Sequence, residues 1–283
     1  MTPSSSILWF SDLHLDLLDR DCAHEWAQSV AARHPGIILI SGDISNGEQL
    51  GRHLRIFAQT IRVPVYFVLG NHDYYGGRWK ETDQQVARAC RVWPHLHHLG
   101  IGEVASLSPE IGLIGHGGWG DGRAGKVTRL EGTVLDFYTM SDFEGCNERG
   151  ALALIQSRGD VAAAALRKSL AAAWPQFKEI WILMHVPPFP EAVLGYHGLP
   201  ASDPVLLPFY CCAAAGDVIR EAAENHPEIK LTVLCGHTHT SAVIRILPNL
   251  EVQVHSSDSP HLTVFSKIDL LNGLWIESGW ELP

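Results

Sequence analysis

Five apolar runs of this chain each lead into polar residues of the kinds that bind metal ions. The runs are residues 7–10, 36–40, 63–69, 180–184 and 231–235. The polar residues that follow them are Asp12 and His14, Asp43, Asn71 with His72 and Asp73, His185, and His237 with His239. One polar stretch after a strand is more typical of a turn. Because residues just past the carboxyl ends of strands in an α/β sheet meet in one crevice, five such stretches predict a single site.

Apolar residues at helical spacing lie between the first runs, over residues 19–34, 48–61 and 78–92. Alternation of strand and helix with short connections predicts right-handed crossovers and a largely parallel sheet in this half. The length of 283 residues, 46% of them hydrophobic, suits one large α/β domain over residues 1–283. We find no internal repeat and no linker that would divide the chain.

The middle and the tail follow a different pattern. Residues 112–125 begin as a strand and continue as a glycine-rich loop, which allows a close approach to a ligand. Residues 141–174 predict one or two helices, broken near Gly159. Residues 186–210 hold six of the 16 prolines and predict a long ordered loop. From Val243 onward, short alternating apolar segments predict antiparallel strands that complete a second sheet.

Charge limits the partners that this chain can have. The formal net charge is −10, from 21 basic and 31 acidic side chains, and the basic ones are dispersed. A broad grip on DNA or RNA needs a basic surface, so we expect no strong nucleic-acid surface. An anionic substrate is still compatible, since bound cations reverse the sign of the charge locally.

The beginning of the sequence carries no targeting signal. No basic region precedes the first apolar run, and Asp12 and His14 end that run far below the length of a signal core or membrane span. The six cysteines lack paired zinc-type spacing, and we interpret them as reduced thiols. These observations predict a cytoplasmic protein without a membrane span.

The candidate ligands are oxygen and nitrogen donors without a thiolate. They are Asp12, His14, Asp43, Asn71, His185, His237 and His239. Seven donors are too many for one tetrahedral zinc ion and fit two ions that share a carboxylate. Two ions roughly 3.5–4 Å apart form a clamp for in-line displacement at phosphorus, with a bridging hydroxide as the nucleophile. Manganese, iron and zinc all suit this donor set.

The ordered motifs Asp12-x-His14, Gly42-Asp43, Gly70-Asn71-His72-Asp73, His185 and Gly236-His237-x-His239 resemble those of the calcineurin-like metallophosphoesterase superfamily. The resemblance implies a first metal held by Asp12, His14, Asp43 and His239. It implies a second metal held by Asp43, Asn71, His185 and His237, so that Asp43 bridges the two. It also implies an α/β fold with two mixed β-sheets packed as a sandwich and flanked by helices.

The same resemblance assigns a catalytic role to His72. This residue matches the histidine of the family that is not a ligand and that stabilises the phosphoryl oxygens or protonates the leaving alkoxide. Asp73, its neighbour, is expected to orient the imidazole of His72, the usual role of a carboxylate beside a working histidine.

Several activities are compatible with this set of motifs. The Asp-Leu-His-Leu opening at residues 12–15 resembles bacterial members that act on phosphodiesters, including cyclic nucleotide phosphodiesterases and the lipid A pathway pyrophosphatase. We therefore predict a phosphodiesterase acting on a small or discrete phosphate ester. A phosphomonoesterase or protein phosphatase is the second interpretation, and a nuclease is the third. A non-enzymatic scaffold with this fold predicts gaps among the seven ligands, and there are none.

Candidate substrate contacts are His116, Arg123 and His197. His116 ends the strand before the glycine-rich loop, and His197 lies in the proline-rich loop; each contacts substrate or has a structural role. Arg123 binds a phosphate oxygen through its planar donor fork or is a solvated loop residue. Trp119 stacks on a base or packs under the loop. The sequence does not predict the oligomeric state.

Overall fold

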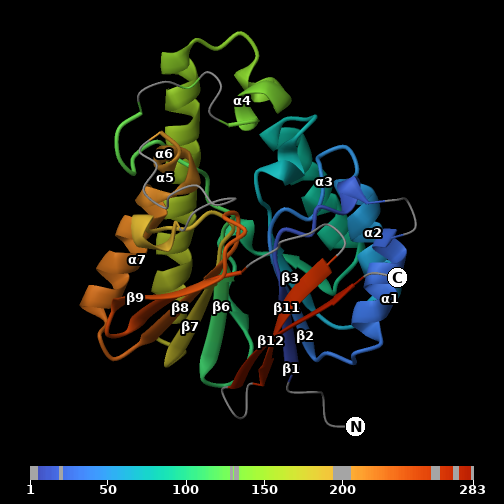
Figure 1. The fold of residues 1–283 in the computed structure, drawn as a ribbon. Coiled ribbons are helices and arrows are strands. Elements are labelled where there is room, and N and C mark those ends of the chain that lie inside the picture. The colour runs from blue at the N-terminus through green and yellow to red at the C-terminus, as the bar shows by residue number, and fades with distance from the viewer. Residues whose placement is uncertain are drawn as a thin grey trace.

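Two six-stranded mixed sheets pack face to face, with helices on the outer face of each, in this computed structural model (Figure 1). The structure describes residues 6–18, 22–127, 130, 134–193 and 205–255, and the backbone of residues 262–269 and 274–281. This four-layer arrangement confirms the predicted fold class.

The first sheet has the strand order β12-β11-β1-β2-β3-β4. Its parallel strands are β1 (Ser6–Phe10), β2 (Ile37–Ser41), β3 (Val65–Val68) and β4 (Leu96–His98). The helices α1 (Cys22–Ala31), α2 (Leu50–Thr60) and α3 (Trp79–Val92) connect them. The predicted succession of parallel strands and helices in this half is therefore confirmed.

The second sheet has the order β5-β6-β7-β8-β10-β9. Its strands are β5 (Ala105–Ser106), β6 (Ile111–Gly115), β7 (Glu179–Leu183), β8 (Lys230–Cys235), β9 (Ala242–Leu247) and β10 (Leu250–Val254). Strands β6, β7, β8 and β10 are parallel, whereas β5 and β9 are antiparallel to their neighbours. The long helices α5 (Glu148–Ala173) and α7 (Ala213–Asn225) cover its outer face.

Short helical segments occupy the connections. They are η1 (Leu15–Leu17), η2 (His72–Tyr74), η3 (Leu99–Ile101), α4 (Asp136–Thr139), η4 (Ser141–Phe143), η5 (Pro190–Ala192) and α6 (Leu207–Tyr210). No helix in the described parts of the chain combines the length and apolarity needed to cross a membrane.

Strand alternation explains why three apolar layers form. Side chains along β1 point in turn to opposite faces, so Leu8 and Phe10 pack toward helices α1 and α2. Ile7 and Trp9 face the other way and pack against residues of the second sheet such as Trp181. Each sheet is thus apolar on both faces, and its polar residues gather where the strands end.

The tail divides between the two sheets, which corrects the sequence prediction. Strands β9 and β10 join the second sheet as expected and pair antiparallel with each other, whereas β10 is parallel to β8, which the prediction of antiparallel strands did not include. Strand β11 (Leu262–Asp269) instead pairs antiparallel with β1, and β12 (Leu274–Glu281) pairs antiparallel with β11. The alternating pattern predicts strands correctly but does not encode which sheet edge each strand extends, because pairing depends on contacts distant in sequence.

Helix α5 runs without a break through Gly159, so the predicted interruption there is wrong. A Cβ atom at this position would lie 2.7 Å from Cβ of Asp121 and 2.9 Å from Nη1 of Arg123. The glycine therefore allows the loop after β6 to pack directly on the helix, and the packing outweighs the helix propensity lost, roughly 1 kcal/mol.

Candidate metal centre

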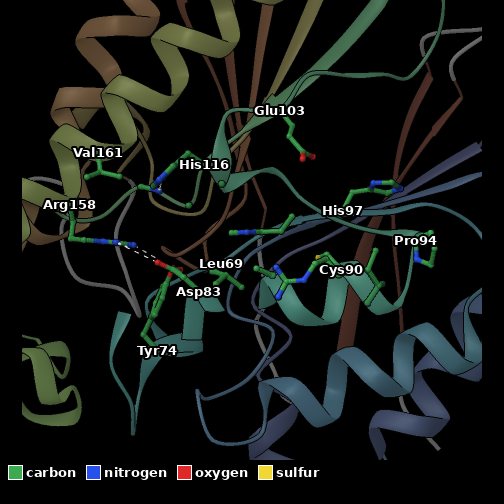
Figure 2. A pocket seen from close by; sticks show the side chains of 17 residues that line it. Leu69, Tyr74, Asp83, Cys90, Pro94, His97, Glu103, His116, Arg158 and Val161 are labelled. Atoms are coloured by element: carbon green, nitrogen blue, oxygen red, sulfur yellow. Dashed lines mark hydrogen bonds and ion pairs between the residues drawn. The ribbon is translucent and has the colours of Figure 1, made fainter. Parts of the chain in front are cut away.

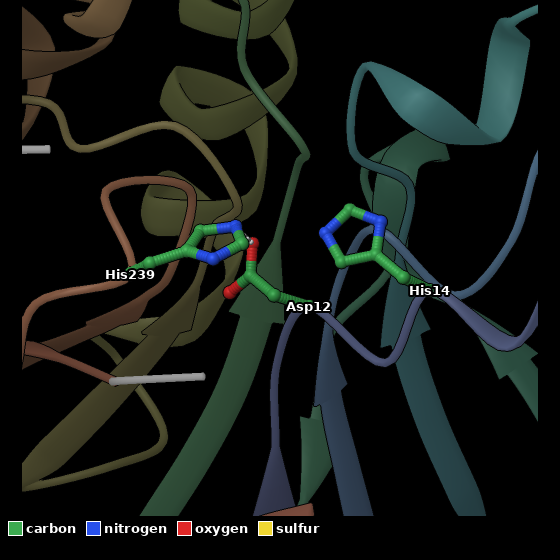
Figure 3. Close-up of side chains that lie close together, drawn as sticks. All are labelled: Asp12, His14 and His239. Carbon is green, nitrogen blue, oxygen red and sulfur yellow. Dashed lines mark ion pairs between the residues drawn. The ribbon is translucent and has the colours of Figure 1, made fainter. Parts of the chain in front are cut away.

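All seven predicted ligands lie at one edge of the two packed sheets, just past the carboxyl ends of β1, β2, β3, β7 and β8. Nε2 of His185 lies 3.3 Å from Oδ2 of Asp43, and Nε2 of His14 lies 3.8 Å from the same oxygen. Nε2 of His239 lies 3.5 Å from Oδ1 of Asp12 (Figure 3). Parallel strand order thus brings together side chains that are up to 227 positions apart in sequence.

Three groups of side chains place their donor atoms within 4.8 Å of one another. The groups are Asp12 with His14 and His239, His14 with Asp43 and His72, and Asp43 with His185 and His237. Asp43 belongs to two of the three groups, and its Oδ2 lies within 4 Å of Nε2 of His14 in one group and of Nε2 of His185 in the other. This arrangement fits two ions that share one carboxylate.

The backbone of these residues is strained. Asp12, His14, Asp43, His237 and His239 have φ values of 52°, 43°, 50°, 71° and 55°. Among the described residues, His34 is the sole further non-glycine residue with positive φ. Each left-handed residue costs on the order of 1 kcal/mol, a cost that recurs at functional sites because the surrounding structure imposes it. The strain is concentrated on five of the seven candidate ligands.

Neighbouring glycines let the backbone approach the donors closely. A Cβ atom on Gly70 would collide with the Asp43 carboxylate, and one on Gly236 would collide with that of Asp12. The motif glycines beside Asn71 and His237 therefore have a steric reason, since no larger side chain fits behind the two carboxylates.

His185 has the proton arrangement of a metal-binding imidazole. Its Nδ1 lies 2.9 Å from the carbonyl oxygen of Ser41, which can only accept, so Nδ1 carries the proton. Nε2 is left facing Asp43 and Oδ1 of Asn71, the latter at 3.2 Å. Burial opposes a charge on His185, yet the Asp43 carboxylate raises its pKa to about 9. A positive charge is therefore favoured at Nε2.

Other donors are left without partners in the protein. Nδ1 of His14 and Nε2 of His237 are buried and neither donate nor accept a hydrogen bond. Burial lowers the pKa of His237 to about 3, so its imidazole is neutral and keeps a lone pair. Burial would raise the pKa of Asp43, but the neighbouring His185 and His72 hold it well below the usual carboxyl range. Neutral imidazoles around ionised carboxylates fit a divalent cation.

His72 lies at the rim of this centre. Its ring centroid is 4.5 Å from that of His14 and 4.3 Å from that of Tyr75, and its backbone N–H donates to Oδ1 of Asp43 at 3.0 Å. The side chain is half-buried and lines a cavity beside the centre. It can therefore reach a molecule bound there.

Asp73 has a different role from the one predicted. Its Oδ1 accepts the N–H of Ser45 at 2.8 Å, and its Oδ2 accepts the N–H of Gly70 at 2.9 Å. The side chain is fully buried, and burial raises its pKa well above the usual carboxyl range. Asp73 ties the loop after β2 to the loop after β3, in place of orienting the imidazole of His72.

Two residues that the sequence analysis missed fix the amide of Asn71. Its Nδ2 donates to Oδ1 of Asp136 at 3.0 Å and to the hydroxyl of Tyr75 at 2.8 Å. The Tyr75 hydroxyl in turn donates to Oδ1 of Asp136 at 2.6 Å. These partners turn Oδ1 of Asn71 toward His185. Asp136 lies 65 positions from Asn71 and in no motif, so no sequence pattern indicated it.

Replacing Asp136 with alanine is expected to weaken metal binding about 10- to 100-fold, the usual effect of removing a partner that orients a ligand. The amide of Asn71 would lose the carboxylate that sets its orientation. Metal content after dialysis against graded chelator measures the effect. Asp217→Ala, an exposed position on α7, is the matched control. Unchanged metal affinity in Asp136→Ala would contradict the orienting role.

The cavity beside the metal centre has a volume of about 240 Å³ and a mixed lining, with polar metal-site residues on one part of its wall. Tyr75, Val134, Leu135, Phe209 and Tyr210 form the aromatic and aliphatic part. None of the described residues that line the cavity is lysine or arginine. Among the described lining residues, only histidine can therefore carry positive charge, and bound metal ions would add to it.

Two of the three predicted substrate contacts do not line this cavity. The guanidinium of Arg123 donates to Oδ2 of Asp121 at 3.1 Å and to Oδ1 of Asp160 at 2.8 Å, and Arg123 is not among the residues that line the cavity at the metal centre. His116 is buried, its Nδ1 accepts the N–H of Gly118 at 3.0 Å, and it lines a different cavity. His197 lies outside the described residues.

Trp119 packs under the loop, which decides between its two predicted roles. The side chain is buried. Its ring meets those of Tyr74 and Trp79 edge to face, with centroids 5.8 and 5.3 Å apart. It is therefore part of the core that supports α3 and cannot stack on a base.

The chain is similar to known proteins over most of its length. The family model described as calcineurin-like phosphoesterase matches residues 5–241. No curated protein matches the sequence significantly.

Solved structures with the same fold are distant in sequence. A phosphopantetheinyl hydrolase from Mycobacterium tuberculosis aligns with a TM-score of 0.65 at 15% identity, over 92% of this chain and 92% of that chain. A dimetal phosphatase from Danio rerio aligns with a TM-score of 0.59 at 12% identity, over 99% and 97%. The protein TT1561 of Thermus thermophilus aligns with a TM-score of 0.56 at 15% identity, over 98% and 99%.

Proposed function

Because the chain belongs to the calcineurin-like phosphoesterase family, we propose that it hydrolyses a small phosphodiester at a centre of two metal ions. Membership of the family indicates a phosphoric ester hydrolase. The preference for a diester is supported by one observation, the absence of lysine and arginine among the described residues that line the cavity at the centre.

The absence of lysine and arginine favours a diester over a monoester because the two esters differ in charge. A phosphodiester carries one negative charge, whereas a monoester carries close to two at neutral pH. Sites that bind a phosphate dianion commonly add arginine donors. The aromatic and aliphatic walls given by Tyr75, Leu135, Phe209 and Tyr210 suit the second organic substituent that a diester has and a monoester lacks. The net charge of −10 disfavours a nucleic-acid polymer as substrate.

Each side chain in the site has a proposed role. Asp12, His14 and His239 hold one ion; Asn71, His185 and His237 hold the other; Asp43 is shared. When bound, two ions polarise the phosphoryl oxygens and lower the pKa of a coordinated water. His72 faces the same cavity, and it donates a proton to the leaving oxygen or stabilises the negative charge of the phosphoryl group. Asp136 and Tyr75 hold the amide of Asn71 in place.

Hydrolysis of bis-p-nitrophenyl phosphate and of p-nitrophenyl phosphate tests the proposed substrate class. The protein is stripped of metal and resupplied with manganese, iron or zinc. We expect kcat/KM to be at least about tenfold higher for the diester, equivalent to about 1.4 kcal/mol in transition-state binding. A preference for the monoester would instead support a phosphomonoesterase. Failure to bind metal and to hydrolyse either ester would support a non-enzymatic scaffold.

A further inference from the structure

A second cavity, of about 450 Å³, lies between α3, β4 and α5 (Figure 2). Arg158, Val161 and His116 line one side of it, and Cys90, Pro94 and His97 line the other. It shares no described lining residue with the cavity at the metal centre. The proposed function gives this cavity no role.

Arg158 has few good partners for a nearly buried cation. Its side chain is 17% exposed, and Nε is buried without a hydrogen-bond partner. Nη1 lies 3.9 Å from Oδ2 of Asp83, and Nη2 donates to the hydroxyl of Tyr74 at 3.4 Å. Both contacts are at the outer limit of useful geometry. A guanidinium has five N–H donors, so most of its capacity is unused in the protein.

Asp83 does not fully neutralise Arg158. The Tyr74 hydroxyl donates to Oδ1 of Asp83 at 2.9 Å, and the carboxylate side chain is 43% exposed to solvent. The cation instead lies over aromatic faces, 5.0 Å from the ring centroid of Trp79 and 5.6 Å from that of Tyr74. These rings hold the guanidinium in place without consuming its N–H donors.

The neighbouring imidazole supplies a further donor. Nδ1 of His116 accepts the N–H of Gly118 at 3.0 Å, so the proton of the neutral ring is on Nε2. Burial, together with the positive charge of Arg158, lowers the pKa of His116 to about 3 and that of His98 to about 4. His116 and Arg158 thus line the same cavity, and each carries N–H donors.

Another part of the wall is apolar. Leu69, Ala87, Cys90, Leu96 and Val161 line it. The remaining charged residues on the wall are Arg91 and Glu103, so the formal charges of the described lining sum to zero with Arg158 and Asp83 included. The cavity therefore combines an under-used cation and an imidazole donor with room for a short hydrocarbon body.

We propose that this second cavity binds a small organic anion, with Arg158 and His116 holding its anionic oxygens and the apolar wall holding its body. A carboxylate and a phosphate monoester offer the same oxygens to a guanidinium. The site is separate from the metal centre and does not depend on the substrate proposed for it.

The floor of the cavity contacts the loops that carry metal-site residues. Gly117 lines the cavity, and its carbonyl oxygen accepts the N–H groups of His185 and Val186, both at 3.0 Å. Leu69, also on the wall, directly precedes the Gly70-Asn71 turn. An occupant of the second cavity thus touches the backbone segments that position His185 and Asn71.

Binding of 8-anilinonaphthalene-1-sulfonate, an aromatic anion that fluoresces in apolar surroundings, tests the proposal on the metal-loaded full chain. We expect saturable binding to one site in the wild type. Arg158→Gln is expected to weaken binding at least about tenfold, because it removes the cation. Arg167→Gln is the matched control: Arg167 lies on the same helix, is 61% exposed and pairs with Glu221.

A blocking variant keeps the test valid if Arg158→Gln does not fold. Ala87 is exposed at the mouth of the cavity on α3, so Ala87→Trp is expected to fold and to weaken binding by a similar factor. Circular dichroism of the variant verifies that it folds. Displacement of the dye by butyrate or by butyl phosphate distinguishes a carboxylate ligand from a phosphate monoester. Absence of saturable binding in the wild type, or wild-type affinity in either folded variant, would overturn the proposal.

Discussion

Asp43→Asn is expected to remove both metal ions and to lower phosphoester hydrolysis at least about a hundredfold, since loss of even an outer partner of a metal ligand costs 10- to 100-fold. Asp43 belongs to two of the three groups of donor atoms, and its Oδ2 lies 3.3 Å from His185 and 3.8 Å from His14. A neutral amide in this place weakens the attraction for both cations at once. Loss of one ion alone would show that the carboxylate is not shared.

Asparagine is the suitable replacement because of the backbone. Asp43 has a φ of 50°, a conformation that asparagine adopts more readily than alanine. Inductively coupled plasma mass spectrometry of the dialysed protein measures the number of metal ions per chain, and circular dichroism verifies the fold. Asp217→Asn, on the exposed side of α7, controls for the loss of one negative charge. Two ions per chain in Asp43→Asn would refute the assignment of the bridge.

His72→Ala is expected to keep both metal ions and to lower kcat about 10²- to 10⁴-fold, the range for loss of general acid catalysis. The imidazole lines the cavity at the metal centre and packs against His14 and Tyr75. The loss should be largest for esters with poor leaving groups, because a leaving alkoxide of high pKa depends most on protonation.

A series of aryl phosphodiesters with leaving phenols of graded acidity measures this dependence. A steeper fall of log kcat with the pKa of the leaving phenol in His72→Ala supports proton donation. An equal loss on every ester would leave charge stabilisation as the role of His72. Loss of metal would instead make His72 a ligand, which its group with His14 and Asp43 permits. His24→Ala, on the exposed face of α1, is the matched control.

The family and the fold class follow from local sequence. Each apolar run is long enough to form one strand, and each is followed by metal-binding residue types. A parallel sheet brings its strand ends to one edge, so these residues meet in one site. The crossovers in the first half are equally local, since the apolar stripes of α1, α2 and α3 have helical spacing. The family model over residues 5–241 and the two packed sheets agree with these predictions.

Partners of individual polar side chains did not follow from local sequence. In the sequence, Arg123 is compatible with a free arginine that binds phosphate. In the structure, its guanidinium donates at 2.8 Å to Asp160 on α5, which is 37 positions away. In the sequence, Asp73 is adjacent to His72 and is compatible with orienting its imidazole. In the structure, the carboxylate of Asp73 accepts the N–H of Ser45, which lies 28 positions earlier. A hydrogen bond depends on distances of a few tenths of an ångström, and adjacency in sequence does not fix them.

Short segments of the sequence specify the residues that can bind metal and the common edge at which their strands end, because ligand types and strand ends are local properties. Tertiary structure decided that Asp136 and Tyr75 orient Asn71, that Asp73 holds two loops together, and that β11 extends the first sheet. The cavity around Arg158 also forms only in the folded protein, because α3 and β4 on the side of the first sheet and α5 on the side of the second sheet supply its walls. Such features arise from contacts between distant segments, and these contacts exist only once the two sheets have packed.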